Sequence, residues 1–193
     1  ALTRAGNGWT LDPGLQDSLG ELGGRTVGLV GFGAVGRCLA PMLHGIGARV
    51  IYTDVAEAAG AIAAFVPLGE LLSTADVVSL HVPLTAATAR MMDEKAFNSM
   101  KPGAILVNTA RGGLVDYQAL HRALANGRLR GAGLDVFDAE PVDVAQPLFR
   151  LRNVVVTPHL AWFTAETLSR SLGVFAENCR RLRDGEPLLN RVA

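Results

Sequence analysis

A glycine-rich turn between a strand-like run and a helical run constrains this chain most. Residues 26–30 form a short apolar run, and the hexapeptide Gly31-Phe32-Gly33-Ala34-Val35-Gly36 follows it directly. A GxGxxG pattern in this place predicts a tight turn, a backbone that can approach a pyrophosphate, and a helix N-terminus whose N–H groups face the anion. Three glycines at these offsets also arise by chance, so the flanking strand and helix carry the argument. The apolar residues of that helix recur at i, i+3, i+4 and i+7 spacing: Val35, Cys38, Leu39, Met42, Leu43 and Ile46.

The rest of the chain alternates short apolar runs with helical segments. Strands are predicted at residues 26–30, 49–53, 77–80, 104–107, 132–136 and 154–156. The clearest helix has Asp116 as its N-cap and ends at Gly127. Continuous apolar strands that alternate with helices predict an α/β fold, a doubly wound parallel sheet covered on both faces.

Three segments are predicted from these patterns. Residues 1–20 are polar and glycine-rich and are interpreted as a linker, residues 21–163 as a dinucleotide-binding domain of the Rossmann type, and residues 164–193 as a long helix with a tail. One face of that helix carries Leu168, Leu172, Phe175, Cys179 and Leu182. Such a stripe is typical of core packing.

The composition argues against several classes of protein. The 18 basic and 18 acidic residues balance, and no run of like charge indicates binding to nucleic acid or an anionic membrane. The longest stretches without charge fall short of the roughly 18 apolar residues that a spanning helix needs. Cys38 and Cys179 lack the spacing of a redox motif, and we expect no metal site and a reducing, cytoplasmic environment.

Asp54 stands at the end of the second predicted strand. A carboxylate in this place can accept hydrogen bonds from an adenosine ribose. No Arg or Lys beside it is available to neutralise a 2′-phosphate, so the sequence favours NAD over NADP. The alternative interpretation is that the glycines form an ordinary turn and Asp54 is a surface loop residue.

Two reactive side chains follow later predicted strands, where open α/β sheets bind ligands. Arg111 lies in a glycine-flanked loop, and its planar guanidinium suits a carboxylate or carbonyl ligand, although a solvated surface arginine is the alternative. His159 follows the valine run and is suited to proton transfer near neutral pH, with a structural histidine as the alternative. Glu140 and Asp135 are both candidates for the acceptor that orients its imidazole. His44 and His121 lie within helices and are given no role.

Several longer motifs also occur in a fixed order from about residue 20 onward. They are TADVVSLHVPLT at 74–85, MKPGA at 100–104, RGGLVD at 111–116, GAGLDVF at 131–137, EP at 140–141 and TPH at 157–159. Together with the dinucleotide loop, these motifs resemble the NAD-binding domain of the D-isomer-specific 2-hydroxyacid dehydrogenases. The resemblance implies an oxidoreductase that interconverts a 2-keto acid and a D-2-hydroxy acid with NAD.

The resemblance also implies a role for each motif residue. Arg111 would bind the substrate carboxylate and polarise its keto oxygen, Glu140 would hold the imidazole and keep it protonated, and His159 would be the acid and base. The NAD cofactor would be held along the whole edge of the sheet. Its pyrophosphate and ribose would contact Gly31, Gly33, Ala34, Val35, Gly36 and Asp54. Its adenine side would contact His81, Val82 and Pro83. Its nicotinamide ribose would contact Thr109 and Ala110, and its carboxamide would contact Asp135.

Complete members of this family have a second, substrate-binding domain, and the active site lies in the cleft between the two. Residues 164–193 would return to that domain, which this chain lacks, so we expect the chain to bind NAD but to turn over poorly or not at all. Family members commonly dimerise through the NAD-binding domain, which implies a homodimer.

His159 is followed by Leu160, Ala161 and Trp162, a His-x-Ala-Trp pattern. This pattern is similar to glyoxylate and hydroxypyruvate reductases and also to the C-terminal-binding-protein corepressors. The indole of Trp162 either lines the substrate pocket or packs under the last helix. The alternative function is therefore an NAD-sensing module that binds protein partners. Another Rossmann protein, such as a methyltransferase, would leave the Arg, Glu and His constellation unexplained.

Overall fold

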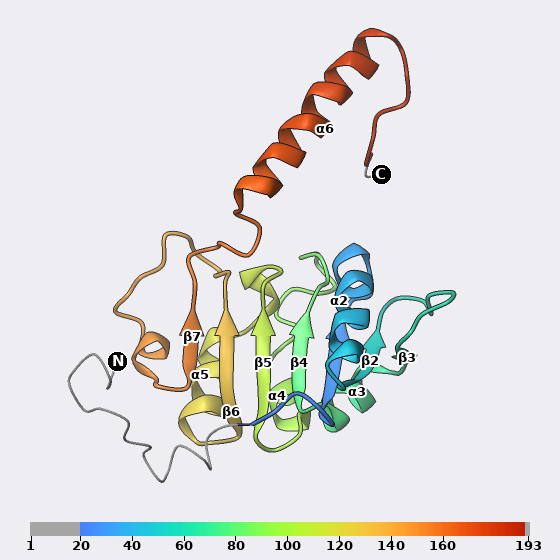
Figure 1. Cartoon of the computed structure of the whole chain (residues 1–193). Helices are drawn as coiled ribbons and strands as arrows, with labels where there is room; N and C mark the ends of the chain where they lie inside the picture. Colours follow the sequence, from blue (N-terminus) through green and yellow to red (C-terminus); the bar gives the residue numbers. More distant parts are fainter. Residues whose placement is uncertain (1–19, 192–193) are drawn as a thin grey trace, which may run out of the picture.

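The structure is a computed structural model that describes residues 20–191, and its centre is a parallel sheet (Figure 1). The seven strands have the order β3-β2-β1-β4-β5-β6-β7. Their bounds are β1 Thr26–Val30, β2 Arg49–Thr53, β3 Ala64–Phe65, β4 Val77–Leu80, β5 Ala104–Asn108, β6 Leu129–Leu134 and β7 Val154–Val156. The chain runs outward from β1 to β3 and then crosses back to β4, so the strand order reverses between β1 and β4. Open α/β sheets bind ligands at this reversal.

Helices lie on both faces of the sheet. Their bounds are α2 Ala34–Gly45, α3 Leu68–Thr74, α4 Glu94–Ser99, α5 Tyr117–Ala125 and α6 Ala165–Arg183, with short 3-10 helices η2 Gly112–Leu114 and η3 Pro147–Arg150. Helices α3, α4 and α5 bury one core, which includes Leu71, Phe97 and Leu120. Helix α2 buries the other core over β1 and β2. The predicted α/β class and the doubly wound parallel sheet are confirmed.

Local signals explain the ends of α5. The Asp116 carboxylate accepts hydrogen bonds from Gln118 N at 3.0 Å and Ala119 N at 2.9 Å, which satisfies two otherwise unpaired donors of the first turn. Gly127 has φ +77°, the left-handed conformation that ends many helices. Both ends are where the sequence predicts them.

Two strand predictions need correction. Strand β6 covers Leu129–Leu134 rather than residues 132–136, because Gly131 and Gly133 lower the apolar signal of a strand that nonetheless pairs with β5 along its length. The two-residue edge strand β3 was not predicted. Residues 61–66 are all apolar, but only two of them pair with β2 and both are exposed, so neither length nor alternation marks a strand there.

The buried face of α2 also differs from the predicted one. Val35, Met42 and Ile46 are exposed, whereas Gly36 and Ala40 are buried against the sheet. Leu39 and Leu43 of the predicted face do pack against this core, so part of the apolar stripe faces the sheet, and the small residues beside them let the helix approach β1 and β2 closely.

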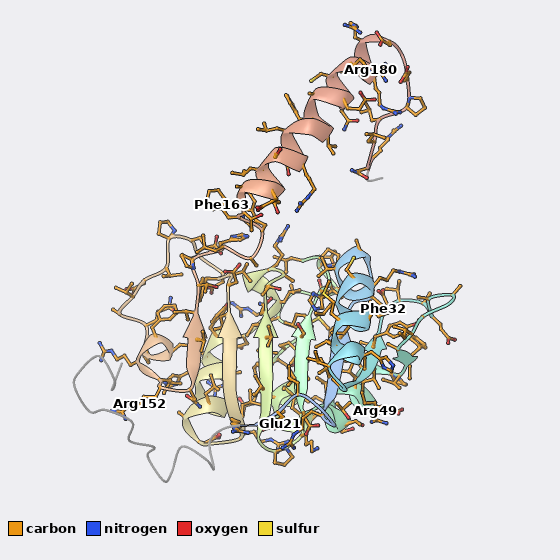
Figure 2. The ribbon with its side chains drawn as sticks, in the orientation of Figure 1. Glu21, Phe32, Arg49, Arg152, Phe163 and Arg180 are labelled. Carbon is orange, nitrogen blue, oxygen red and sulfur yellow. The ribbon has the colours of Figure 1, made fainter. Side chains whose placement is uncertain are left out.

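The sheet is not covered on both faces along its whole width. On the α2 side, β5 carries half-buried Ile105 and Val107, and β7 carries exposed Val155. Helix α6 rises away from the carboxyl edge of the sheet (Figure 1) and contains no buried residue. Phe163 lies where α6 leaves the sheet and Arg180 near the far end of α6 (Figure 2). Within the described part of the chain, the predicted core packing of the α6 stripe is therefore wrong: Phe175 is 67% exposed.

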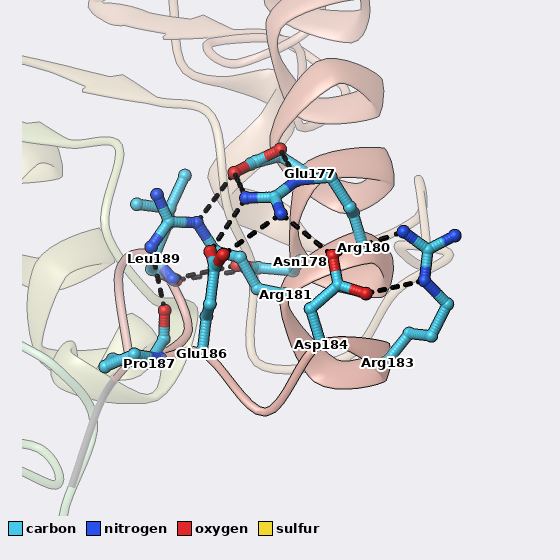
Figure 3. A network of polar contacts seen from close by, with 9 residues as sticks. All are labelled: Glu177, Asn178, Arg180, Arg181, Arg183, Asp184, Glu186, Pro187 and Leu189. Atoms are coloured by element: carbon cyan, nitrogen blue, oxygen red, sulfur yellow. Dashed lines mark hydrogen bonds and ion pairs between the residues drawn. The ribbon is translucent and has the colours of Figure 1, made fainter.

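Ion pairs fasten the segment after α6 to the end of that helix (Figure 3). The Arg180 guanidinium pairs with Glu177 at 2.9 Å, Asp184 at 3.0 Å and Glu186 at 2.8 Å. Hydrogen bonds from Arg180 and Arg181 lower the pKa of Glu177 to about 2. The chain after Gly185 consequently folds back along α6.

The predicted linker, residues 1–20, lies outside the described residues except for Gly20. No helix between residues 20 and 191 is long and apolar enough to cross a membrane.

Candidate active site

The loops that follow β1, β4, β5, β6 and β7 meet at the carboxyl edge of the sheet and enclose a cavity of about 700 Å³. Its lining joins residues far apart in the sequence: Val35, His81, Val82, Pro83, Thr109, Ala110, Arg111, Asp135, His159, Ala161 and Trp162. The cavity therefore brings together most of the predicted cofactor residues with two of the three predicted catalytic ones.

The three glycines of the turn after β1 meet different surroundings. Gly31 has φ +100°, and a Cβ there would lie 2.7 Å from the main-chain carbonyl carbon of His81. A Cβ on Gly36 would lie 2.6 Å from the Gly31 oxygen, so both positions exclude a side chain. A Cβ on Gly33 would meet nothing within 4 Å. The turn thus presents open backbone at Gly33, where a pyrophosphate can approach.

The first turn of α2 fits an anion. Ala34 and Val35 begin the helix, and the N-cap Gly33 supplies no side-chain hydrogen bond. N–H groups of a first turn lack partners within their helix and carry partial positive charge. Arg37 follows one turn later, and its guanidinium lies 5.6 Å from the centre of the Phe32 ring. Sequence reasoning passed over Arg37, although a basic residue directly after the third glycine was a visible signal.

Asp54 is tied to the glycine turn. Its Oδ2 accepts a hydrogen bond from Phe32 N at 2.7 Å, and its Oδ1 accepts one from Val55 N at 2.7 Å. The carboxylate thus lies beside the glycine turn, and the residue is partly exposed. This position fits an acceptor for ribose hydroxyls next to the pyrophosphate site.

The loop after β4 closes the cavity with His81, Val82 and Pro83. The His81 main-chain N–H donates to the Val30 oxygen at 2.7 Å, so this loop is attached to the end of β1. The His81 Nε2 lies 2.9 Å from the Ser79 hydroxyl. Burial lowers the pKa of His81, so the neutral imidazole is favoured beside the cofactor cavity.

Asn108 shapes the loop that carries Thr109, Ala110 and Arg111. Its fully buried side chain accepts from Ala110 N at 3.0 Å and donates to the Arg111 oxygen at 2.9 Å. The Arg111 guanidinium is exposed and donates to the Ala110 oxygen at 2.6 Å. Its five N–H groups leave further donors that can bind an anionic ligand in the cavity. Sequence reasoning gave Asn108 no role, because a single amide carries no pattern.

His159 and Glu140 form a hydrogen-bonded pair. The His159 Nδ1 lies 2.9 Å from Glu140 Oε2, and Phe137 N donates to Glu140 Oε1 at 2.9 Å. The hydrogen bond from His159 is the main cause that lowers the pKa of Glu140. An ionised carboxylate only accepts, so Nδ1 carries the proton and Nε2 is the nitrogen that exchanges one. Among the described residues, no hydrogen bond engages Nε2.

Asp135 does not contact the imidazole. Its carboxylate accepts hydrogen bonds from Thr157 Oγ1, Leu160 N and Ala161 N. Of the two carboxylates that the sequence offered as the acceptor for His159, the structure therefore places Glu140 against the ring and Asp135 against the main chain of the loop.

Trp162 lines the same cavity as Arg111 and His159. Its ring meets Phe163 edge-on at 5.2 Å, and the residue is 51% exposed. This exposure leaves part of the indole open to the cavity. No group of three or more potential metal ligands occurs among residues 20–191.

The sheet order, the glycine turn and the cavity at the strand reversal define a dinucleotide-binding domain of the Rossmann class. Residues 3–161 match the model of the D-isomer specific 2-hydroxyacid dehydrogenase family, NAD binding domain, and the chain belongs to this family.

Relatives and solved structures agree with this assignment. The chain is 45% identical over 169 residues to a glyoxylate reductase of Korarchaeum cryptofilum, covering 84% of this chain and 50% of that one. It is 45% identical over 170 residues to a D-3-phosphoglycerate dehydrogenase of Mycobacterium bovis, covering 86% of this chain and 32% of that one. The chain thus spans a third to a half of the length of these relatives.

Two solved structures show the same fold. The TT0316 protein from Thermus thermophilus has a TM-score of 0.89 and 42% identity, covering all of this chain and 61% of that one. A D-lactate dehydrogenase with NAD+ from Lactobacillus jensenii has a TM-score of 0.85 and 31% identity, covering 98% of this chain and 61% of that one.

Proposed function

We propose that this domain forms the cofactor half of an NAD-dependent oxidoreductase that interconverts a 2-keto acid and a D-2-hydroxy acid. The observation that carries the proposal is the 2.9 Å bond between His159 and Glu140 at the edge of a cavity that also holds Arg111. Bound NADH supplies a hydride to the keto carbon. The glyoxylate reductase relative supports a small 2-keto acid as substrate.

The roles of the three side chains follow from their chemistry. The Arg111 guanidinium binds the substrate carboxylate through two parallel hydrogen bonds and draws electron density from the keto oxygen. His159 Nε2–H donates its proton to that oxygen, which becomes the hydroxyl of the product, and in the reverse direction neutral Nε2 accepts the hydroxyl proton. Glu140 holds the ring by Nδ1–H and favours its charged form.

The resemblance to the family also suggests roles for α6, for Trp162 and for a second copy of the chain. The exposed stripe of α6 and the folded-back segment after it fit a return to a second domain, which would provide the opposite wall of the cleft. Trp162 would line the substrate pocket from this side. A second copy of the chain is the expected protein partner, and a chain without the second wall is expected to bind NADH but to reduce keto acids poorly.

The test combines binding with turnover. NADH and NADPH are titrated calorimetrically into the chain. NADH oxidation with glyoxylate and larger 2-keto acids is then followed in a longer polypeptide that also contains a second domain, which provides the opposite wall of the cleft. Saturable NADH binding and reduction of a 2-keto acid support the proposal. Tight NADH binding without turnover of any 2-keto acid would instead favour the NAD-sensing alternative.

Asp54 is expected to govern the choice of cofactor. Its carboxylate would accept ribose hydroxyls and repel a 2′-phosphate, so Asp54→Ala should weaken NADH binding by about 10- to 100-fold, as expected for lost hydrogen bonds to a charged group. The variant should also narrow the preference for NADH over NADPH. Calorimetric titration measures both.

Two variants sharpen the Asp54 experiment. Asp54→Asn keeps an acceptor for Phe32 N, so it separates loss of charge from loss of the turn geometry. Glu57→Ala removes an exposed carboxylate three residues away and should bind NADH like the parent chain. Equal affinity of the unchanged protein for NADPH and NADH would contradict the assigned role.

Glu140→Gln is expected to move the pH dependence of keto-acid reduction. The hydrogen bond from His159 lowers the pKa of Glu140, so an ionised carboxylate stands beside the protonated imidazole that reduction needs. The rate of reduction falls as the pH rises, because the imidazole loses that proton. Without the carboxylate the fall should begin at a lower pH.

The control for Glu140→Gln is Asp138→Asn. Asp138 is a neighbouring exposed carboxylate that accepts from Ala139 N and makes no bond to the imidazole. The pH profile of kcat/KM should therefore be unchanged in Asp138→Asn. A profile that stays unchanged in Glu140→Gln as well would remove Glu140 from its role.

A further inference from the structure

The segment Thr157–Ala161 after β7 converges on one buried carboxylate at the end of β6. Asp135 is 3% exposed. Its Oδ1 accepts from the Thr157 hydroxyl and from Leu160 N at 2.8 Å, and its Oδ2 accepts from Ala161 N at 2.9 Å. The donors lie on both sides of His159 in the sequence. The carboxylate thus holds the loop before and after the histidine.

The main chain of Asp135 also holds His159 itself. The His159 N–H donates to the Asp135 oxygen at 2.8 Å, and His159 adopts φ 54°. A positive φ is unfavourable for a residue with a Cβ and persists where its surroundings hold it in place. Four hydrogen bonds from this loop to Asp135 keep His159 in this conformation.

The ionised form of the Asp135 carboxylate can accept hydrogen bonds from all three donors of the loop. Burial alone would raise the pKa of its carboxyl group, but the hydrogen bonds from Thr157, Ala161 and Leu160 outweigh burial and hold the pKa below its usual value. An ionised carboxylate offers about four acceptor positions, and three are taken by the loop. Asp135 also lines the cofactor cavity, so the fourth position is available to a donor there.

We propose that Asp135 is a positioning residue that sets the His159 imidazole against Glu140 by holding the Thr157–Ala161 loop. The inference rests on the proposed function for its catalytic meaning, because it deepens the account of the same site. Asp135 holds the loop and makes no hydrogen bond to the ring, so its role differs from that of Glu140. The charged groups around the imidazole are Glu140, Asp135 at the end of β6, and Arg111 on the loop after β5.

The experiment follows the His159 imidazole by NMR in the NADH-free chain and needs no turnover. In Asp135→Asn, the amide NH2 faces main-chain N–H donors, so the loop should shift and the Nδ1–H bond to Glu140 should weaken. The Nδ1–H proton of His159 should then exchange faster with solvent and its resonance should move upfield, as it should in Glu140→Gln. In the double variant the two shifts should not add, because both changes remove the same bond.

Thr157 provides a matched pair that avoids the risk of misfolding. Thr157→Val removes the hydroxyl that Asp135 accepts and keeps the side-chain shape, whereas Thr157→Ser keeps the hydroxyl. The valine variant should move the His159 Nδ1–H resonance in the same direction as Asp135→Asn, and the serine variant should leave it at the parent position.

Two outcomes separate the possible failures. An unchanged His159 Nδ1–H resonance in both Asp135→Asn and Thr157→Val, together with a lower melting temperature, would overturn the proposal and leave Asp135 as a residue of fold stability. A shifted Nδ1–H resonance in a protein that reduces no 2-keto acid would uphold the positioning role and refute the proposed function.

Discussion

His159→Gln is expected to lower kcat for 2-keto acid reduction by about 10²- to 10⁴-fold, the usual contribution of a general acid. Glutamine can still donate a hydrogen bond to a keto oxygen, but its amide does not release a proton to it. The remaining site is intact, because the imidazole is half-exposed and holds no other element in place. NADH affinity should therefore stay within a few-fold of the parent value. Steady-state kinetics with NADH and a 2-keto acid, at saturating substrate, measures the loss.

The matched control for this variant is His44→Gln. His44 lies in the last turn of α2, is exposed and lines no part of the cavity. That variant should retain full activity. A His159→Gln protein with kcat close to the parent value would show that another group supplies the proton.

Gly112→Ala is expected to cause the largest loss of stability among single changes near the site. A Cβ at Gly112 would approach Phe137 C, Phe137 O and Asp138 N to less than 3.0 Å, and these are main-chain atoms that no side-chain rotation can remove. The loop after β5 would have to separate from the loop after β6. Overpacking of this kind typically costs about 1–3 kcal/mol and occasionally more, which is several degrees in Tm for a chain of this size.

The same change should also damage the site. The loop after β5 carries Arg111, and the Phe137 N–H on the other loop holds the Glu140 carboxylate. Moving the loops apart should therefore weaken the His159–Glu140 pair and reduce kcat in addition to Tm. Thermal denaturation and steady-state kinetics measure the two effects.

Gly69→Ala is the matched control for Gly112→Ala. Gly69 lies in α3 with nothing within 4 Å of a Cβ, so alanine should stabilise the helix by up to about 1 kcal/mol. A loss of stability in Gly112→Ala and a gain in Gly69→Ala would show that the contact between the two loops, and not alanine itself, causes the loss. A Gly112→Ala protein that melts at the parent temperature would contradict the close approach.

Close contacts between loops, such as the one at Gly112, hold together the loops that line the cavity. Gly31 packs against the main chain of His81, which joins the loops after β1 and β4. Gly112 joins the loops after β5 and β6, and Asp135 joins the end of β6 to the loop after β7. Each connection links adjacent strands of the sheet, so the walls of the site are held together in strand order.

The sequence by itself determined the class of fold and the cofactor turn. Apolar runs, the glycine pattern and the Asp116 cap are local signals. The turn after β1, helix α5 and the sheet, apart from β3 and the bounds of β6, occur where those signals predict them. The motifs that resemble the family identified it correctly, because such motifs hold many residue types at fixed spacing.

Only the tertiary structure decided which side chains meet. Whether Glu140 or Asp135 bonds the imidazole depends on how the loops after β6 and β7 lie in space, and no periodicity records that. The exposed stripe of α6 shows the same limit, since an apolar pattern indicates that a face can pack but not which surface covers it. Local interactions are encoded by spacing along the chain, whereas partners in a site are selected by the packing of segments distant in sequence.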